Sequence, residues 1–397
     1  MHILIISALF PPEPVVSARL SSDIASELSV SNTVTVISPK PSRPFGFQFT
    51  NKISSFYFKH IQVGSFICAS SSLIGRFRES YSFGKHSYRY IAANNQNIDV
   101  IYANTWPLFG QYFAVKAARK YHIPILIHVQ DIYPESLLKK LPFGSSFVNR
   151  IILPLDKYIL GKSSHIIAIS RNMKDYLVNS RKISQDKVTV IPNWQDEESF
   201  ALNLIEPKAS KESLFTFMYL GNIGPVAGLD LVLKAYAKAN IKNSRLIIAG
   251  SGSMKENLMK QAENYLDCII EFWSVTDSEV PVVQCKADAF LLPLKKGIGL
   301  TSSPSKVPAY MFSARPIIAS IDKDSDTESV IISANCGWVI EPENIDKLAA
   351  MMNEIVLIPK DRMKILGENG RKYALNNFSK KVNVQKLVSL ITGTIPS

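Results

Sequence analysis

The segment from Gly297 to Ser320 reads GIGLTSSPSKVPAYMFSARPIIAS, and it indicates the fold more clearly than any other stretch of the 397 residues. It follows an apolar run at 289–294 that predicts a buried strand, and a second such run at 316–319 lies near its end. Between them come a hydroxyl-rich loop and a helix pattern from about 307 to 314. The N–H groups at such a helix start, with the helix dipole and Lys306, make an anion site. A serine that only caps the helix explains the pattern equally well.

Apolar runs of this kind alternate with helical patterns along the whole chain. Continuous Val, Ile and Leu runs are typical of strands buried on both faces of a parallel sheet. Strands separated by helix-length segments indicate βαβ units. The expected strands are 3–6, 34–37, 100–102, 125–129, 166–169 and 188–191 in the first half, and 215–220, 246–249, 269–272, 289–292, 317–319 and 338–340 in the second.

Two such series predict an α/β chain of two Rossmann-like, doubly wound domains. We expect an N-terminal domain at 1–200, a C-terminal domain at 201–375, and a final helix at 376–397 that packs back toward the N-terminal domain. The acidic and polar stretch at 196–214 marks the boundary. Because doubly wound domains bind ligands at the carboxyl ends of their strands, the sequence predicts a ligand cleft.

Composition limits the class of protein. With 46% hydrophobic and 20% charged residues, the chain is that of a globular protein with a substantial core. No apolar run reaches the roughly 18 residues that span a bilayer, and the first residues lack the features of a signal peptide. We therefore expect a cytoplasmic protein. Four scattered cysteines without a CxxC pattern argue against zinc and against a disulfide framework.

Positive charge is concentrated in the first half of the chain. Residues 1–200 hold 22 Lys and Arg against 13 Asp and Glu, which is +9 of the formal net charge of +12. Residues 40–90 alone hold eight basic residues, one acid and twelve Phe or Tyr. Such a mixture suits the anionic inner surface of a membrane, where each cation contributes about 1 kcal/mol. A solvated face over an aromatic core is the alternative, and nucleic acid is the least favoured partner.

Glycine turns follow two strands of the second domain. The first contains Gly221, Asn222 and Gly224, and the second contains Gly250. Glycines at such turns let a ligand approach the backbone closely, although α/β folds use glycine in turns regardless of function.

Polar residues also follow strands of the first domain. Pro12 and Glu13 come after the first strand, and Arg19 lies on the next predicted helix. Asn193 follows the last strand, in a turn that could equally serve packing between the domains.

The segment HVQDIYPE at 128–135 follows another buried strand. It supplies His128, Asp131 and Glu135 as catalytic candidates, since a carboxylate at a strand end can act as a general base or bind sugar hydroxyls. Capping of a helix N-terminus is the structural alternative for Glu135. A P-loop, an HExxH motif and a GxGxxG turn after the first strand are all missing from the sequence.

Taken together, these segments resemble the family 4 glycosyltransferases of the GT-B fold over essentially the whole chain. The matching pieces, in order, are FPPE at 10–13, DIYPE at 131–135, IAIS at 167–170, IPNWQD at 191–196, YLGNIG at 219–224 and SSPSK at 302–306. The pattern is most similar to the bacterial branch that assembles O-antigen, colanic acid and capsule, which includes N-acetyl-L-fucosamine and other aminodeoxyhexose transferases.

The resemblance implies an enzyme that moves a sugar from a UDP-sugar to a polyprenyl-diphosphate-linked saccharide. The donor would lie on the C-terminal domain and the acceptor on the N-terminal domain. Transfer in this family is usually retaining and needs neither a metal nor a cofactor beyond the sugar nucleotide. Such an enzyme would be peripheral on the inner face of the plasma membrane.

The chain departs from the usual family pattern at its charged positions. Asn222 and Ala227 stand where many members have Arg and Lys, and Thr301 and Ala309 stand where many have Glu. In the family the second Glu commonly binds the ribose, so the resemblance assigns no ribose-binding residue in this sequence. The best remaining diphosphate ligands are Ser302, Ser303, Ser305 and Lys306. The missing charges leave two alternatives, a non-catalytic partner subunit and a GT-B-fold UDP-sugar epimerase.

Overall fold

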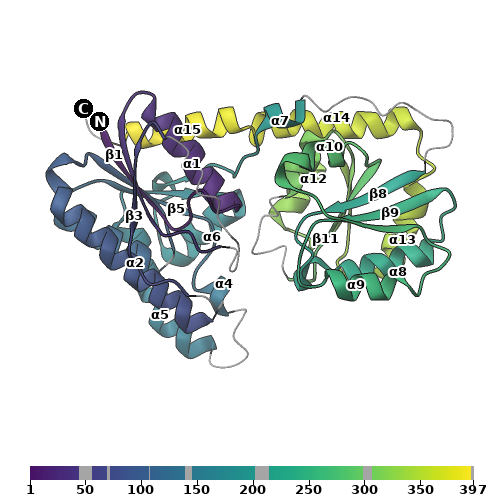
Figure 1. Ribbon diagram of the computed structural model, residues 1–397, viewed down its shortest axis with the longest axis horizontal. Coiled ribbons are helices and arrows are strands. Elements are labelled where there is room, and N and C mark those ends of the chain that lie inside the picture. The colour runs from purple at the N-terminus through teal and green to yellow at the C-terminus, as the bar shows by residue number, and fades with distance from the viewer. Residues whose placement is uncertain are drawn as a thin grey trace. The chain divides into compact units, whose positions relative to one another are not determined.

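The computed structural model describes residues 1–43, 56–68, 72–106, 108–138, 145–201, 214–297 and 306–394. The chain forms two compact units (Figure 1): an N-terminal unit of Met1–Asn193 with Asn383–Ser397, and a C-terminal unit of Trp194–Val382. The chain therefore passes between the units twice.

Among its described residues, the N-terminal unit has a seven-stranded parallel sheet in the order β3-β2-β1-β4-β5-β6-β7. Its strands are β1 (His2–Ser7), β2 (Thr33–Pro39), β3 (Lys59–Val63), β4 (Val100–Asn104), β5 (Ile125–Val129), β6 (His165–Ala168) and β7 (Val188–Val190). The order reverses between β1 and β4, where Ile5 pairs with Val36 on one side and Tyr102 on the other. The sequence-based expectation missed β3, because this edge strand mixes polar and apolar residues and forms no apolar run.

Helices cover both faces of this sheet. They are α1 (Val16–Ser29), α2 (Leu73–Asn94), α3 (Phe109–Lys120), α4 (Glu135–Leu138), α5 (Ser145–Lys162) and α6 (Arg171–Arg181). Helices α2, α3, α5 and α6 pack in series on one face, and α1 covers the other (Figure 1). Leu4 and Ile6 point into the core beneath α2 and α3, where Phe83 and Ala114 are fully buried. The sequence forms these helices because each presents an apolar stripe to the sheet.

The described part of the C-terminal unit has a six-stranded parallel sheet in the order β10-β9-β8-β11-β12-β13. Its strands are β8 (Phe215–Leu220), β9 (Ser244–Ala249), β10 (Ile270–Trp273), β11 (Ala289–Pro293), β12 (Ile317–Ser320) and β13 (Gly337–Ile340). Alternate residues of β8 enter different cores, Phe217 and Tyr219 on one face and Met218 and Leu220 on the other. This explains why the strand is a continuous apolar run.

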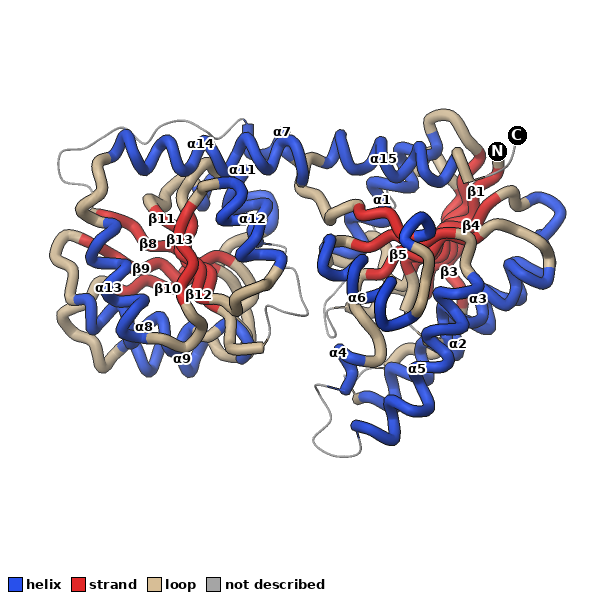
Figure 2. The backbone as a smooth tube through the Cα atoms, turned by 180° about the vertical axis from the view of Figure 1, so that it is seen from behind, coloured by secondary structure: helices blue, strands red, loops and turns tan. Residues whose placement is uncertain are grey.

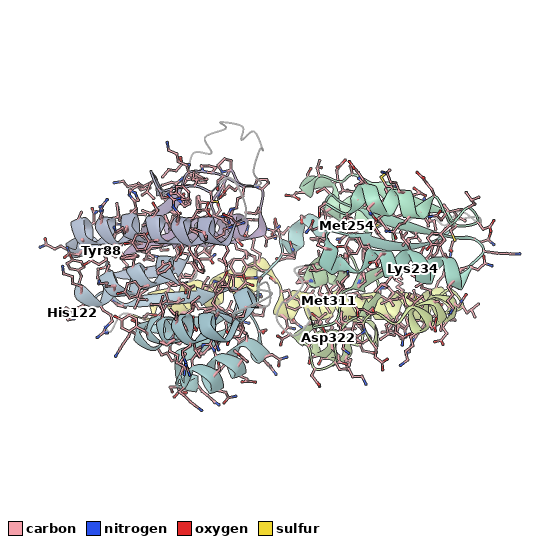
Figure 3. The ribbon with its side chains drawn as sticks, turned by 90° about the horizontal axis from the view of Figure 1, so that it is seen from below. Tyr88, His122, Lys234, Met254, Met311 and Asp322 are labelled. Carbon is pink, nitrogen blue, oxygen red and sulfur yellow. The ribbon has the colours of Figure 1, made fainter. Side chains whose placement is uncertain are left out.

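Helices cover both faces of this sheet too, as Figure 2 shows. They are α7 (Glu197–Ala201), α8 (Leu229–Ala239), α9 (Lys255–Ala262), α10 (Val280–Gln284), α11 (Lys306–Phe312), α12 (Asp326–Ala334), α13 (Ile345–Ile355) and α14 (Lys360–Asn377). Met311 of α11 is fully buried, whereas Lys234 of α8 is exposed (Figure 3). These two sheets confirm the predicted α/β class with two Rossmann-like domains.

The last helix, α15 (Lys380–Thr392), begins in the C-terminal unit and continues in the N-terminal unit. Its residues Val384, Leu387 and Ile391 are buried. Across the described ranges, no helix is both long and apolar enough to cross a bilayer.

Candidate functional site

The N-terminal unit gathers polar residues at the carboxyl ends of β1, β4 and β5, around the point where the strand order reverses. Ser7 at the end of β1 donates a hydrogen bond to Ser21 of α1 (2.8 Å), and the Asn104 side chain at the end of β4 donates to the same hydroxyl (3.0 Å). All three residues are buried. This cluster fixes the start of the first loop against β4, at the place where doubly wound sheets bind ligands.

The FPPE turn after β1 and the helix that follows it, α1, contain three of the predicted acceptor residues. Pro12 and Arg19 are exposed, and the Pro11–Pro12 peptide bond is cis. Glu13 is buried, and its carboxylate accepts hydrogen bonds from the N–H groups of Phe10 (3.2 Å), Ser42 (2.8 Å) and Arg43 (3.0 Å). Burial raises the pKa of Glu13 even though these hydrogen bonds oppose the shift. The Glu13 carboxylate thus ties the turn to the segment after β2.

His128 and Asn193, predicted from separate segments, belong to one hydrogen-bonded chain. The Asn193 amide donates to Gln130 Oε1 (2.8 Å), Gln130 Nε2 lies 3.1 Å from His128 Nε2, and His128 Nδ1 lies 2.6 Å from the Tyr102 hydroxyl. Since Gln130 presents its NH₂ group to Nε2, the ring proton belongs on Nδ1 and is donated to Tyr102. Burial lowers the pKa of His128 to about 3, so the ring is neutral at physiological pH.

The Asn193 Oδ1 atom at the end of this chain is buried and has no hydrogen-bond partner among the described residues. Such an unpaired acceptor is costly in a folded protein.

Asp131 is the next residue in the sequence after Gln130, and it is exposed. Burial, followed by the charge of the Asp131 carboxylate, raises the pKa of Tyr133. Asp131 is therefore a solvent-accessible carboxylate at the carboxyl end of β5.

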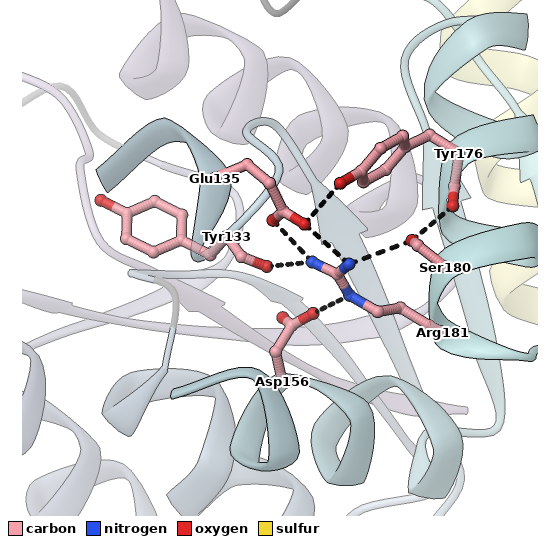
Figure 4. Close-up of polar contacts among 6 residues, drawn as sticks. All are labelled: Tyr133, Glu135, Asp156, Tyr176, Ser180 and Arg181. Atoms are coloured by element: carbon pink, nitrogen blue, oxygen red, sulfur yellow. Dashed lines mark hydrogen bonds and ion pairs between the residues drawn. The ribbon is translucent and has the colours of Figure 1, made fainter. Parts of the chain in front are cut away.

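Glu135 has a different environment, shown in Figure 4. Its carboxylate accepts hydrogen bonds from both terminal nitrogens of Arg181 (2.9 and 2.7 Å) and from the Tyr176 hydroxyl (2.6 Å). Arg181 also donates to the carbonyl of Tyr133 (2.5 Å) and to buried Asp156 (2.7 Å). These contacts connect α4 to α5 and α6.

The charges of this network follow from its burial. Burial alone would raise the pKa of Glu135, but the hydrogen bonds from Arg181 and Tyr176 lower it below its ordinary value. Burial raises the pKa of Asp156 to about 6, although Arg181 opposes the shift. Glu135 therefore holds its negative charge at neutral pH and shares it with Arg181. Sequence reasoning missed Arg181, because nothing in the sequence near residue 181 points to residue 135.

In the C-terminal unit the glycine turns after β8 and β9 pack directly on each other. Gly221 and Gly250 have φ angles of +152° and +129°, and a Cβ on Gly250 would lie 2.1 Å from the carbonyl oxygen of Gly221. Only glycine fits a contact this close. Asn222 is exposed, and its backbone carbonyl accepts a hydrogen bond from the Tyr219 hydroxyl (2.6 Å). A Cβ on Gly224 would lie 3.2 Å from the Asn222 side-chain nitrogen.

Lys306, the first residue of α11, extends over this turn. A Cβ on Gly221 would lie 2.1 Å from Lys306 Cε, and Lys306 Nζ lies 4.9 Å from the centre of the Tyr219 ring. Within the described ranges, no carboxylate is close enough to form an ion pair with it. Burial lowers its pKa to about 8. Lys306 is thus a half-buried ammonium group directly above Gly221.

Tyr310 places the Lys306 helix against β8. Its hydroxyl accepts a hydrogen bond from the Leu220 N–H and donates one to the Leu220 carbonyl, each at 2.9 Å. Its ring stacks on Phe290 of β11 at 4.0 Å. Because β8 and β11 flank the reversal of strand order, Lys306 lies at the kind of position where doubly wound sheets generally bind ligands. Ser302, Ser303 and Ser305 lie outside the described residues.

Two family models match consecutive parts of the chain. Residues 19–199 match "Glycosyltransferase Family 4", and residues 202–373 match "Glycosyl transferases group 1".

Relatives and solved structures agree with this match. The chain is 23% identical to the "Probable glycosyltransferase WbjE" of Pseudomonas aeruginosa over 74% of each protein. It is 22% identical to the Escherichia coli "UDP-Gal:alpha-D-GlcNAc-diphosphoundecaprenol alpha-1,3-galactosyltransferase" over 82% of this chain and 81% of that one. Other relatives, at 21% and 22% identity, are named for colanic acid and capsular polysaccharide biosynthesis. Anabaena HepE, solved with UDP, superposes with a TM-score of 0.69 at 14% identity over 99% of this chain and all of that one, which confirms the GT-B fold.

Proposed function

The chain belongs to glycosyltransferase family 4, and we propose that it transfers a sugar, an N-acetylated aminodeoxyhexose, from a UDP-sugar to a polyprenyl-diphosphate-linked saccharide in bacterial surface polysaccharide synthesis. The observation that carries this proposal is Lys306, half-buried over the Gly221 turn without a carboxylate partner among the described residues.

Partial removal of an ammonium group from water, without a counter-ion, is unfavourable, and a ligand that supplies negative charge offsets this cost. A nucleoside diphosphate supplies such charge, and the turns at 221–224 and 250–252 offer a surface on which phosphate oxygens can approach the backbone. In this proposal Gly221, Asn222, Gly224, Gly250 and Lys306 bind the donor, together with the serines at 302, 303 and 305. Lys306 would stabilise the charge that develops on the leaving UDP, the role that a metal ion plays in other transferases.

The acceptor side of the proposal rests on the carboxyl edge of the N-terminal sheet. Pro12, Glu13 and Arg19 would shape the acceptor site, and Asn193 and Gln130 would present hydrogen-bonding groups to sugar hydroxyls. His128, whose two ring nitrogens are already bonded to Tyr102 and Gln130, would position Gln130. Of the two candidate carboxylates we assign the acceptor hydroxyl to Asp131, because it is exposed while Glu135 is bound by Arg181 and Tyr176. Glu135 then orders the loop that carries Asp131.

A lipid-linked acceptor is suggested by the relative that is named for a diphosphoundecaprenol substrate. The cations and aromatic rings of residues 40–90 would hold the enzyme on the inner face of the membrane. Part of this region, 44–55 and 69–71, lies outside the described residues.

Transfer assays with the purified full chain test the proposal. A panel of UDP-sugars is offered with synthetic polyprenyl-diphosphate saccharides, with and without EDTA, and label transfer to lipid is measured. We expect transfer from one UDP-sugar that persists in EDTA and falls at least tenfold in the Lys306→Ala variant. The Lys306→Arg variant, which keeps the charge, is the matched control.

Other outcomes separate the remaining functions. Turnover of a UDP-sugar in the absence of any acceptor would favour an epimerase. If neither UDP nor any other nucleotide binds the chain in calorimetry, it is a non-catalytic partner subunit. If Lys306→Ala leaves donor KM and kcat unchanged, the assignment of Lys306 is wrong.

A further inference from the structure

The N-terminal unit has an apolar groove of about 410 Å³ that the proposed function has not yet used. It is lined by Phe66, Ile74, Phe77, Arg78, Tyr81, Ser82 and Phe109. Phe66 follows β3, Ile74 and Phe77 lie in the first turns of α2, and Phe109 begins α3 directly after the β4 segment. In a parallel sheet these positions lie at the carboxyl edge. The groove therefore opens at the same edge of the sheet as Asp131 and His128.

Specific contacts build the walls of the groove. A Cβ on Gly84 of α2 would lie 2.7 Å from the carbonyl oxygen of Phe109, so glycine allows α2 and α3 to approach closely. The Ser80 hydroxyl accepts a hydrogen bond from the Gly110 N–H (2.8 Å). The Phe109 ring then meets Phe77 at 6.0 Å and Tyr81 at 5.8 Å, both edge to face. These contacts make one wall a fixed aromatic surface.

The groove combines exposed apolar surface with positive charge. Ile74 is 74% exposed, Tyr81 43% and Phe66 38%. The Arg78 guanidinium lies 4.4 Å from the centre of the Phe66 ring, and Lys85 Nζ lies 5.0 Å from that of Tyr81. The only acid of α2 is Glu79, which is buried and paired with Arg43 (2.6 Å). A ligand here would be apolar with an anionic group close by.

We propose that the groove binds the first isoprene units of the acceptor lipid, with Arg78 beside its diphosphate and its sugar toward Asp131 at the same edge of the sheet. This inference rests on the proposed function, because it takes the lipid-linked acceptor from there. The apolar groove, the Arg78 guanidinium on its wall and the exposed Asp131 carboxylate at the same edge of the sheet correspond to the tail, the diphosphate and the sugar of such a lipid. Attachment to a bilayer surface alone would require only protruding side chains, and it would not require a groove between two helices and a loop.

Kinetic assays of the full-length enzyme with two acceptors test the inference. Both acceptors carry the same diphosphate saccharide, but one has an undecaprenyl tail and the other a single isoprene unit. The variant is Ile74→Glu, chosen because an exposed residue can be changed without disturbing the core. We expect its KM for the long-tailed acceptor to rise about tenfold, with kcat and the KM for the short-tailed acceptor unchanged. The matched control is Val30→Glu, an equally exposed residue (78%) that follows the end of α1 at the opposite edge of the sheet.

Photo-crosslinking gives a result that does not depend on catalysis. Undecaprenyl diphosphate with a diazirine in its first isoprene units is crosslinked to the full chain, and the labelled peptides are mapped by mass spectrometry. Labelling of residues 72–82, competed by unlabelled undecaprenyl diphosphate, supports the groove even if no sugar is transferred. Labelling elsewhere, or an equal rise in KM for both acceptors, would overturn the proposal. If Ile74→Glu loses binding to anionic vesicles that contain no polyprenyl lipid, and no crosslink forms in the groove, the groove contacts the bilayer instead.

Discussion

At the scale of single residues, the site depends on side chains whose charge state is set by burial. Lys306 lies over Gly221 with a pKa lowered to about 8, and His128 is held neutral with a pKa lowered to about 3. Both shifts arise because a desolvated cation is less stable than the neutral form. The Lys306 side chain is therefore suited to bind an anion near neutral pH, whereas the neutral His128 ring can only donate and accept hydrogen bonds.

The Lys306 pKa predicts how UDP affinity depends on pH. Below about 8 the side chain is an ammonium ion that attracts the diphosphate, and above 8 it is increasingly neutral. If only the ammonium form binds, affinity falls about fourfold between pH 7 and 8.5. Calorimetric titration of UDP at both pH values measures the change. The Lys306→Arg variant should show a flat profile, and the same fall in that variant would assign the titration to another group.

The hydrogen-bonded chain predicts one tautomer of His128. Between pH 5.5 and 8 the ring should be neutral with its proton on Nδ1, because Gln130 donates to Nε2 and Tyr102 accepts from Nδ1. Nitrogen-15 NMR of the imidazole distinguishes this form from the imidazolium, and the spectrum of a His128→Gln variant assigns the signal. An imidazolium signal at pH 6 would contradict the buried hydrogen-bonded arrangement.

At the scale of secondary-structure elements, short helices next to the candidate sites are held in place by hydrogen bonds between residues far apart in the sequence. Helix α4 has only four residues, too few to be stable alone. Arg181 of α6 holds it through Glu135 and through the carbonyl of Tyr133. In the C-terminal unit, the Tyr310 hydroxyl similarly joins α11 to the end of β8. In both units the element next to the candidate site is positioned by a partner distant in sequence.

Replacing Arg181 with leucine should release α4. The change leaves Glu135 and buried Asp156 without a cation, and such a loss typically costs about 3–5 kcal/mol. Because the chain has two units, a local measurement is more informative than global unfolding. Hydrogen exchange of the amides of residues 136–138, which bond to Ile132 and Pro134, should accelerate at least tenfold. Exposed Arg171 lies on the same helix, and the Arg171→Leu control should change that exchange little.

At the scale of the whole molecule, the chain passes between its two units twice. Residues next to the two passages, all of them in the C-terminal unit, are hydrogen-bonded to one another. The Gln195 N–H donates to the Phe378 carbonyl and the Lys380 N–H to the Gln195 carbonyl, each at 3.0 Å. The Glu197 carboxylate accepts from the Ser379 hydroxyl and from the Lys380 N–H (2.8 Å), which caps the start of α15. Burial opposes the charge on Glu197, but these hydrogen bonds lower its pKa.

Weakening this junction should alter turnover without touching either ligand surface. Glu197→Gln removes the charge that caps α15, at a cost of about 1 kcal/mol, and should loosen the segment at 378–384. Because residues at such junctions commonly govern domain motion, we expect kcat and KM for the donor to change together. Steady-state kinetics, with hydrogen exchange of residues 378–384, measure both effects. Faster exchange with unaltered kinetics would make Glu197 purely structural.

The sequence by itself was enough to predict both sheets, with the exception of β3. Strands buried on both faces must be continuous apolar runs, and that signal is local. Strand β3 lies at the edge and is only half buried, so its sequence KHIQV gives no such signal. The glycine turns and the order of motifs also pointed to the family, because glycine at a strand end reflects a local need for close backbone contact.

Tertiary structure alone decided which candidates act together. It linked His128 to Asn193 through Gln130, placed Lys306 over Gly221, and bound Glu135 to Arg181. These pairs are separated by between 46 and 85 positions in the sequence. Sequence periodicity reports which face of an element is buried, whereas the partner of a buried polar group depends on how distant elements pack. For that reason the sequence determined the fold and the family, and the three-dimensional packing determined the chemistry available at each site.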